Sequence, residues 1–204
     1  MRCRSRSLPL VAALVAGASS VSAQAAAGPP ASPRPTAEQQ IAVAVLPAPE
    51  PLRAGAEVRG YDATGRLVTL RPGSNGLICL ADDPAANNFH VACYQKELDP
   101  FMARGRELKA LKASRETIDS VRGAEIAAGK LTMPPQPTAL YELFGPEGSW
   151  NPETNEVKGA QAVYVIYIPY ATEAMTGMAQ QGHKGGMPWL MFPGKPWAHV
   201  MITP

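Results

Sequence analysis

A few side chains in this sequence could do acid–base or nucleophilic chemistry. The histidines are His90, His183 and His199, and Asp82 and Asp83 are adjacent carboxylates. A serine hydroxyl is a weak nucleophile and needs a base that a third group holds in place. Ser74 would be that nucleophile and His199 its base. Asp82 or Asp83 would orient the imidazole, although a serine in a glycine-rich turn is more often an ordinary turn residue.

A metal centre is a second possibility for the same histidines. Catalytic zinc commonly has three protein ligands, and three histidines could supply them. The histidines are far apart in the sequence, however, so only folding could bring them together. The chain contains no nucleophile elbow, zinc-binding helix, phosphate-binding loop, dinucleotide-binding turn or EF-hand loop. The sequence therefore predicts no metal or cofactor, and it leaves His199, Ser74 and Asp82 as weak catalytic candidates.

Aromatic side chains point to ligand binding without catalysis. Aromatic rings supply a large contact area at a low cost in conformational entropy. Trp150 stands in a polar loop, and Trp189 and Trp197 flank the turn-like sequence PGKP. With His183 in its glycine-rich segment, these tryptophans are the predicted ligand-binding residues. The alternative for Trp189 and Trp197 is that they complete a hydrophobic core.

The N-terminus has the pattern of a secretory signal peptide. Three arginines without an acid precede the apolar run LPLVAALVAGA, and VSA before Gln24 fits a signal-peptidase site. The run is much shorter than the roughly 20 residues that span a bilayer. We therefore expect residues 1–23 to be a cleaved signal and the mature protein to be periplasmic or extracellular, not membrane-spanning. Residues 24–35 are rich in Ala, Gly, Pro and Ser, which predicts a disordered linker.

The charge balance argues against a nucleic-acid partner. The chain has 19 Lys and Arg against 17 Asp and Glu, but three of the arginines lie in residues 1–23. The mature chain is therefore close to neutral, with charges of both signs mixed along it. Nucleic-acid binding normally needs a basic face that replaces phosphate counterions. We expect instead a small ligand or a cell-envelope partner, and a monomer or weak oligomer.

The cysteine content indicates a disulfide. Cys3 would leave with the signal, so the mature chain keeps Cys79 and Cys93. An even pair of cysteines in an exported protein favours a disulfide. Metal ligation is the competing interpretation, but neither cysteine belongs to a C-x-x-C motif or a histidine cluster.

The patterns along residues 36–204 predict a single α+β domain. Thr36 and Gln39 fit a capping box for a short helix over 36–46, with an apolar stripe of Ile41, Val45 and Leu46. The run over 161–170 is apolar on both faces, which is typical of a central strand that is covered on both sides. We expect a mostly antiparallel sheet of about six to eight strands with two or three helices. The remaining predicted strands lie in 57–62, 66–72, 77–83, 89–95, 138–146 and 188–202, and the other helices in 98–114 and 115–130.

Over nearly all of its mature length, the chain resembles a family of exported bacterial hypothetical proteins. Two motifs carry the resemblance: N-G-x-x-C at Asn75, Gly76 and Cys79, and G-x-P-W…A-H-x-M at Gly186, Pro188, Trp189, Ala198, His199 and Met201. No activity, cofactor or fold is attached to that family, so the resemblance implies only the extent of the domain.

These observations together favour binding over catalysis. We expect a non-enzymatic binding or structural protein of the bacterial cell envelope. The alternative is a hydrolase or a metal-dependent enzyme that uses His199. In the strand that ends the chain, His199 shares a face with Trp197 and Met201, so the choice depends on whether that face meets a packed layer or a cleft.

Overall fold

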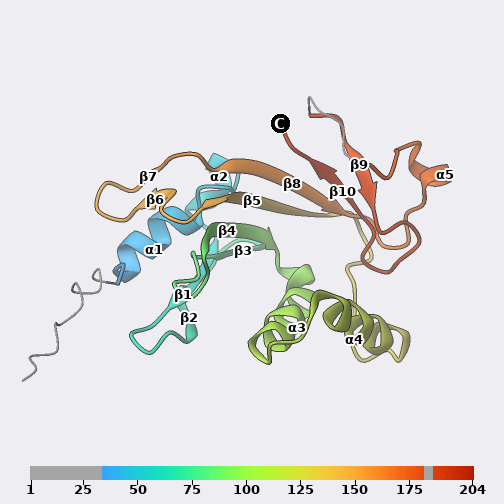
Figure 1. Ribbon diagram of the computed structural model, residues 1–204, viewed down its shortest axis with the longest axis horizontal. Helices are drawn as coiled ribbons and strands as arrows, with labels where there is room; N and C mark the ends of the chain where they lie inside the picture. The colour runs from blue at the N-terminus through green and yellow to red at the C-terminus, as the bar shows by residue number, and fades with distance from the viewer. Residues whose placement is uncertain (1–33, 182–185) are drawn as a thin grey trace, which may run out of the picture. The chain divides into compact units, whose positions relative to one another are not determined.

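The computed structural model describes residues 34–181 and 186–204, and residues 34–204 form one compact unit (Figure 1). The predicted signal peptide, most of the predicted linker, and His183 lie outside the described residues. No helix of the described part is long and apolar enough to cross a membrane.

An eight-stranded sheet forms the centre of the fold, in the order β2-β1-β3-β4-β5-β8-β10-β9. All neighbouring strands are antiparallel except β1 and β3, which are parallel. This confirms the predicted α+β class and the mostly antiparallel sheet. The strands are β1 (Glu57–Tyr61), β2 (Leu67–Arg71), β3 (Leu77–Leu80), β4 (Asn88–Gln95), β5 (Thr138–Pro146), β8 (Gln161–Tyr167), β9 (Trp189–Met191) and β10 (His199–Ile202), and a separate hairpin consists of β6 (Trp150–Asn151) and β7 (Glu156–Val157).

The described residues form five α-helices, more than the two or three predicted. The difference lies in α2 and α5, which are only four residues long. The capping box of Thr36 and Gln39 is present, and the Ser114 hydroxyl accepts a hydrogen bond from the Thr117 amide at the start of α4. The helices are α1 (Ala37–Ala44), α2 (Glu50–Arg53), α3 (Asp99–Ala110), α4 (Arg115–Ala127) and α5 (Glu173–Thr176), and a short 3-10 helix precedes α3 (Lys96–Leu98).

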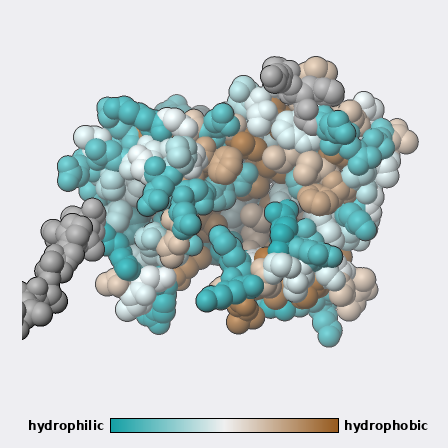
Figure 2. Space-filling view, viewed as in Figure 1, coloured by the Kyte–Doolittle hydropathy of each residue, from teal (hydrophilic) through white to brown (hydrophobic). Residues whose placement is uncertain are grey.

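The helices cover the two faces of the sheet unequally. On one face, Phe101 of α3 packs against Tyr94, Val165 and Tyr167, and this cluster is the largest part of the core. On the other face, Ala44 of α1 packs over strands β1, β3 and β4. Figure 1 shows α3 and α4 together, apart from α1 and α2. Figure 2 shows mostly hydrophilic residues on the visible surface, with hydrophobic ones gathered around a hollow near its centre.

A buried glutamine docks α1 on the sheet. The Gln40 side chain is 6% exposed. Its Oε1 accepts a hydrogen bond from the Tyr61 amide at 2.7 Å, and its Nε2 donates to the carbonyl oxygens of Tyr61 and Pro35, both at 3.1 Å. These bonds fix the rotation of α1 about its own axis. Because of that rotation, α1 buries Val43 and Ala44 fully, whereas the predicted stripe of Ile41, Val45 and Leu46 is only half-buried.

Candidate functional site

An open groove of about 270 Å³ lies on the face of the sheet that α1 covers only in part. Residues 46–53, which comprise the turn after α1 and helix α2, form one wall, and strands β5 and β8 form the floor. Residues of both contribute side chains: Leu46, Pro47, Glu50 and Arg53 from the wall, and Tyr141, Leu143 and Tyr164 from the floor. We call this feature the tyrosine groove.

The floor of the tyrosine groove includes a part of strand β8 that the neighbouring elements leave uncovered. Val163, Val165 and Tyr167 are buried on one face of β8, as the sequence predicted for a central strand. On the other face Tyr164 is 37% exposed, so the expectation that both faces are covered is wrong at this position. The reason is that α1 covers β1, β3 and β4, while a separate apolar cluster around Leu190 packs over the far end of β8.

Two tyrosines on neighbouring strands define the floor. Tyr141 of β5 lies directly opposite Tyr164 of β8 in the register. Their ring centroids are 6.0 Å apart and the ring planes cross at 73°, an edge-to-face arrangement that aromatic pairs favour. Neither hydroxyl has a hydrogen-bond partner among the described residues. The floor is therefore an aromatic surface with two hydroxyls available to a ligand.

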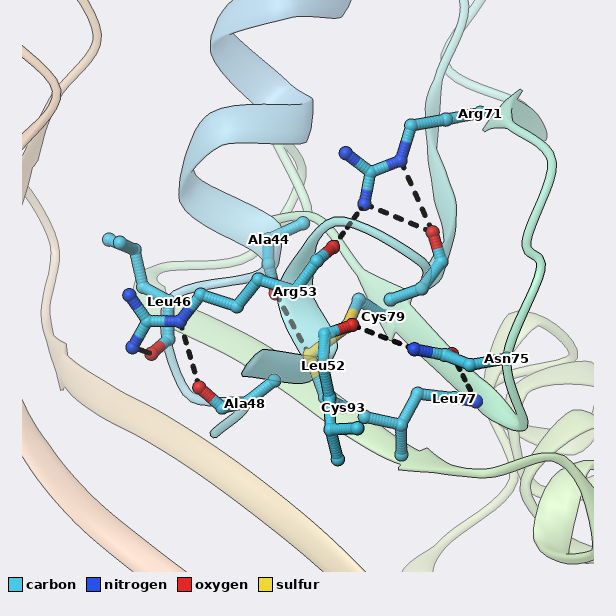
Figure 3. The surroundings of a disulfide bond; sticks show 11 residues. Ala44, Leu46, Ala48, Leu52, Arg53, Arg71, Asn75, Leu77, Cys79 and Cys93 are labelled. Atoms are coloured by element: carbon cyan, nitrogen blue, oxygen red, sulfur yellow. Dashed lines mark hydrogen bonds between the residues drawn. A yellow bond between two sulfur atoms is a disulfide. The ribbon is translucent and has the colours of Figure 1, made fainter. Parts of the chain in front are cut away.

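A disulfide lies beneath the wall. Cys79 of β3 and Cys93 of β4 are directly opposite and are joined by an S–S bond of 2.06 Å, which confirms the predicted pairing. Both cysteines are fully buried and pack against Ala44 and Tyr141. The Sγ of Cys93 lies 3.2 Å from the carbonyl oxygen of Ala44 (Figure 3). The bond thus joins the two strands on which the end of α1 rests.

Hydrogen bonds from side chains to backbone carbonyls hold the wall in shape (Figure 3). The Nε of Arg53 donates to the Ala48 carbonyl at 2.8 Å, and its Nη2 donates to the Leu46 carbonyl at 2.7 Å. The Nδ2 of Asn75 donates to the Leu52 carbonyl at 2.8 Å. Asn75 belongs to the N-G-x-x-C motif, so this motif ties the wall to the disulfide-bonded strand. A wall fixed in this way costs a ligand little ordering entropy on binding.

The weak catalytic candidates do not come together. Ser74 precedes β3 and Asp82 follows it, so they lie at opposite ends of that strand. Strands β4, β5 and β8 separate β3 from β10, which carries His199. With neighbouring strands about 4.8 Å apart, β3 and β10 are on the order of 19 Å apart. The Ser74–His199–Asp82 assembly therefore does not form. Asp83 lies in the loop after β3 as well, where its Oδ1 accepts a hydrogen bond from the Ala85 amide.

His199 faces a packed layer, not a cleft. The residue is 8% exposed, and its Nδ1 is 2.8 Å from the carbonyl oxygen of Trp197. Its ring lies between Tyr167 and Phe192, with centroids at 4.9 and 5.7 Å. Burial lowers the pKa of His199 below its ordinary value, against the smaller opposing effect of the bond to Trp197. The imidazole is therefore neutral at pH 7, and its Nδ1–H donates to the carbonyl.

The buried neutral imidazole predicts a loss of stability in mild acid. Below the ordinary histidine pKa of 6.5, the unfolded chain takes up a proton at this position and the folded chain does not. The free energy of unfolding should fall from pH 7 to pH 5, by at most about 1.4 kcal/mol per pH unit from this group. In His199→Phe, which keeps an aromatic ring in the layer, this part of the slope should vanish. Urea titrations at each pH measure it.

Phe192→Leu is the control for that experiment, because it changes the same packed layer and removes no titratable group. It should keep the slope of the unchanged protein. Equal slopes for His199→Phe and the unchanged protein between pH 7 and pH 5 would contradict the assignment.

The predicted ligand-binding tryptophans lie in different parts of the fold. Trp197 is 9% exposed and packs against Phe101 in the main core. Trp189 lies in β9, half-buried. Trp150 lies in β6, where its Nε1 donates to Asn155 Oδ1 at 3.2 Å and its ring packs beside a cluster around Phe89. None of the three lines the tyrosine groove.

A histidine–carboxylate pair that sequence reasoning missed lies on the opposite face of β5. The Nε2 of His90 is 2.9 Å from Oε1 of Glu142, and Asp82 Oδ1 accepts a hydrogen bond from the His90 amide at 2.8 Å. No serine, threonine or cysteine is bonded to this imidazole within the described residues. In that same part of the chain, no three His, Cys, Asp or Glu residues are grouped so that they could hold a metal ion. The pair links strands β4 and β5.

The residues of the tyrosine groove were not among the sequence candidates. The alternation of β8 already set Tyr164 on the face opposite Val163 and Val165, but nothing local indicated that this face would be open. The chain matches no protein-family model, and neither curated proteins nor solved structures gave a match. The interpretation of the groove therefore depends on its own geometry.

Proposed function

We propose that this protein is a non-enzymatic binding protein of the bacterial cell envelope and that the tyrosine groove is its ligand site. The observation that supports this most directly is the groove itself. Arg53 and Asn75 hold its wall, and its floor presents two tyrosine hydroxyls that have no hydrogen-bond partner among the described residues. Sites for drug-sized molecules typically have roughly 300–1,000 Å³. At about 270 Å³ the groove suits a small ligand or a short segment of an extended one.

Features of the structure and of the sequence support an exported compartment. A fully buried disulfide is typical of proteins that fold in an oxidising environment, and none of the described helices could span a membrane. The arginine-rich and apolar pattern of residues 1–23 supports export by a cleavable signal. The resemblance to exported bacterial proteins supports the same compartment. We place the mature protein in the periplasm or outside the cell, as a monomer or weak oligomer.

The geometry favours binding over the enzymatic alternative. A general base must reach the proton that it removes. His199 is instead buried against the Trp197 carbonyl, and Ser74 and Asp82 lie in the loops at opposite ends of β3. We therefore do not propose a hydrolase or a metal-dependent enzyme based on His199.

The proposal is tested by a ligand screen combined with floor variants. A library of short peptides and oligosaccharides is added to the mature chain, and compounds that raise the melting temperature are titrated by calorimetry. Tyr164→Ala should weaken the binding of a true ligand by about tenfold or more, because it removes half of the aromatic floor. Tyr170→Ala is the matched control, since Tyr170 is 55% exposed and lies outside the groove. A ligand that binds the unchanged protein and Tyr164→Ala equally would contradict this site.

A further inference from the structure

Arg53 has an unused hydrogen-bonding edge. A guanidinium carries five N–H donors in a rigid fork. Nε and one N–H of Nη2 are bonded to the Ala48 and Leu46 carbonyls. Nη1 has no hydrogen-bond partner within the described residues, and Figure 3 shows it on the side of the guanidinium away from the disulfide. Nη1 and the second N–H of Nη2 together form the end-on edge of the fork, and that edge is available.

The charge of Arg53 is also left without an ion pair in the described part of the chain. Arg59, Arg104 and Arg106 each form an ion pair with a carboxylate, whereas no carboxylate of the described residues pairs with Arg53. Glu50 lines the same groove, but it is not within ion-pair distance of Arg53. The wall of the groove therefore holds a positive charge that is bonded only to neutral carbonyls. An anionic group on a ligand would complete it.

The surroundings of Arg53 in the groove restrict the rest of such a ligand. Leu46, Pro47 and Leu143 are apolar, so the atoms next to the anionic group should be apolar too. The hydroxyls of the two floor tyrosines can donate to carbonyl oxygens, and the Glu50 carboxylate can accept an N–H. A plain alkyl chain has nothing to offer these polar groups, whereas a peptide backbone supplies both the carbonyl and the amide.

We propose that the tyrosine groove binds the free carboxy terminus of a short peptide whose last side chain is apolar. The end-on edge of Arg53 donates two hydrogen bonds to the terminal carboxylate, a geometry that guanidinium and carboxylate share. The apolar side chain lies against Leu143 and the tyrosine rings. This inference deepens the proposed function and rests on it.

The test compares two probes that differ only at the carboxylate. Acetyl-Ala-Leu as the free acid and acetyl-Ala-Leu-amide are titrated into the isotopically labelled mature chain, and amide shifts are followed by NMR. The free acid should bind about tenfold or more tightly than the amide, because a charge-assisted bidentate contact is lost in the amide. Added salt should weaken the binding of the acid more than that of the amide. Hexanoate, an apolar carboxylate without peptide groups, should bind more weakly than the free acid.

Variants assign the effect to Arg53. Arg53→Lys keeps the charge but not the fork, so it should reduce the preference for the acid over the amide. Arg66→Gln is the control, because the Arg66 side chain is 78% exposed and not part of the groove. It should leave the preference unchanged. If Arg53→Lys does not fold, since Arg53 also holds the wall, the comparison of probes on the unchanged protein still decides.

The outcomes separate the two proposals. Equal binding of the acid and the amide overturns the carboxylate inference and leaves the binding site standing. Hexanoate that binds as tightly as the free acid overturns the choice of a peptide. A folded Arg53→Lys variant with an undiminished preference for the acid overturns the role of Arg53. If the library screen identifies a ligand that binds outside the groove and neither peptide probe binds, both proposals fail.

Discussion

Replacement of both Cys79 and Cys93 by alanine is expected to lower the free energy of unfolding by about 3 kcal/mol. The disulfide closes a loop with a sequence separation of 14, and the chain-entropy model assigns about that value to a loop of roughly 15 residues. The bond is also fully buried beneath Ala44 and beside Tyr141. Its removal therefore loosens the strands that carry the wall of the tyrosine groove, and ligand affinity should fall together with stability.

Urea unfolding of the oxidised mature protein and of the double variant measures the difference. Because both sulfur atoms are buried, a mild reductant should leave the folded protein oxidised. The unchanged protein, when unfolded, reduced and refolded, should match the double variant in stability, which makes it the internal control. A difference below about 1 kcal/mol would contradict the structural role of the bond.

Gln40→Leu is expected to cost about 3 kcal/mol and to detach α1 from the sheet. The side-chain amide bonds to both backbone groups of Tyr61 and to the Pro35 carbonyl. Leucine has a similar volume but no polar atoms, so the Tyr61 amide and carbonyl would remain unpaired beneath the helix. A buried polar group that loses its partner costs about 1–3 kcal/mol.

Gln40→Glu refines this prediction. A carboxylate can still accept from the Tyr61 amide, but it cannot donate to the two carbonyls, so its loss of stability should be similar at neutral pH and smaller once the carboxyl is protonated. Gln180→Leu makes the same change at an exposed position and should be nearly neutral. Thermal unfolding of all three variants gives the comparison. A Gln40→Leu variant as stable as Gln180→Leu would show that these bonds do not hold the helix.

Local patterns in the sequence were sufficient for most elements. The capping box at Thr36 and the serine cap at Ser114 depend on contacts three residues apart, and both are present in the structure. The hairpin of β1 and β2 turns at Gly65, whose φ of 81° glycine adopts without strain. The alternation of β4 places Val91 and Cys93 on one face and Ala92 on the other, and their core clusters follow this alternation.

Long-range packing decided the rest. Alternation sorts residues onto two faces of a strand, but it does not say which face another element covers. His199 and Tyr164 are both polar residues on apolar strands. One is buried between Tyr167 and Phe192, and the other stays exposed.

By itself, then, the sequence determined the α+β class, the positions of the main elements and the pairing of Cys79 with Cys93, because these follow from contacts near in the chain or from strand parity. The tertiary structure alone decided the parallel pairing of β1 with β3, the Gln40 contacts and the tyrosine groove. The parallel pairing and the Gln40 contacts join segments that meet only after the chain has folded, and the groove depends on how far α1 extends over the sheet. Because α1 is short, Tyr164 stays 37% exposed and Tyr141 half-buried on the floor of the groove, with Arg53 in the wall beside them.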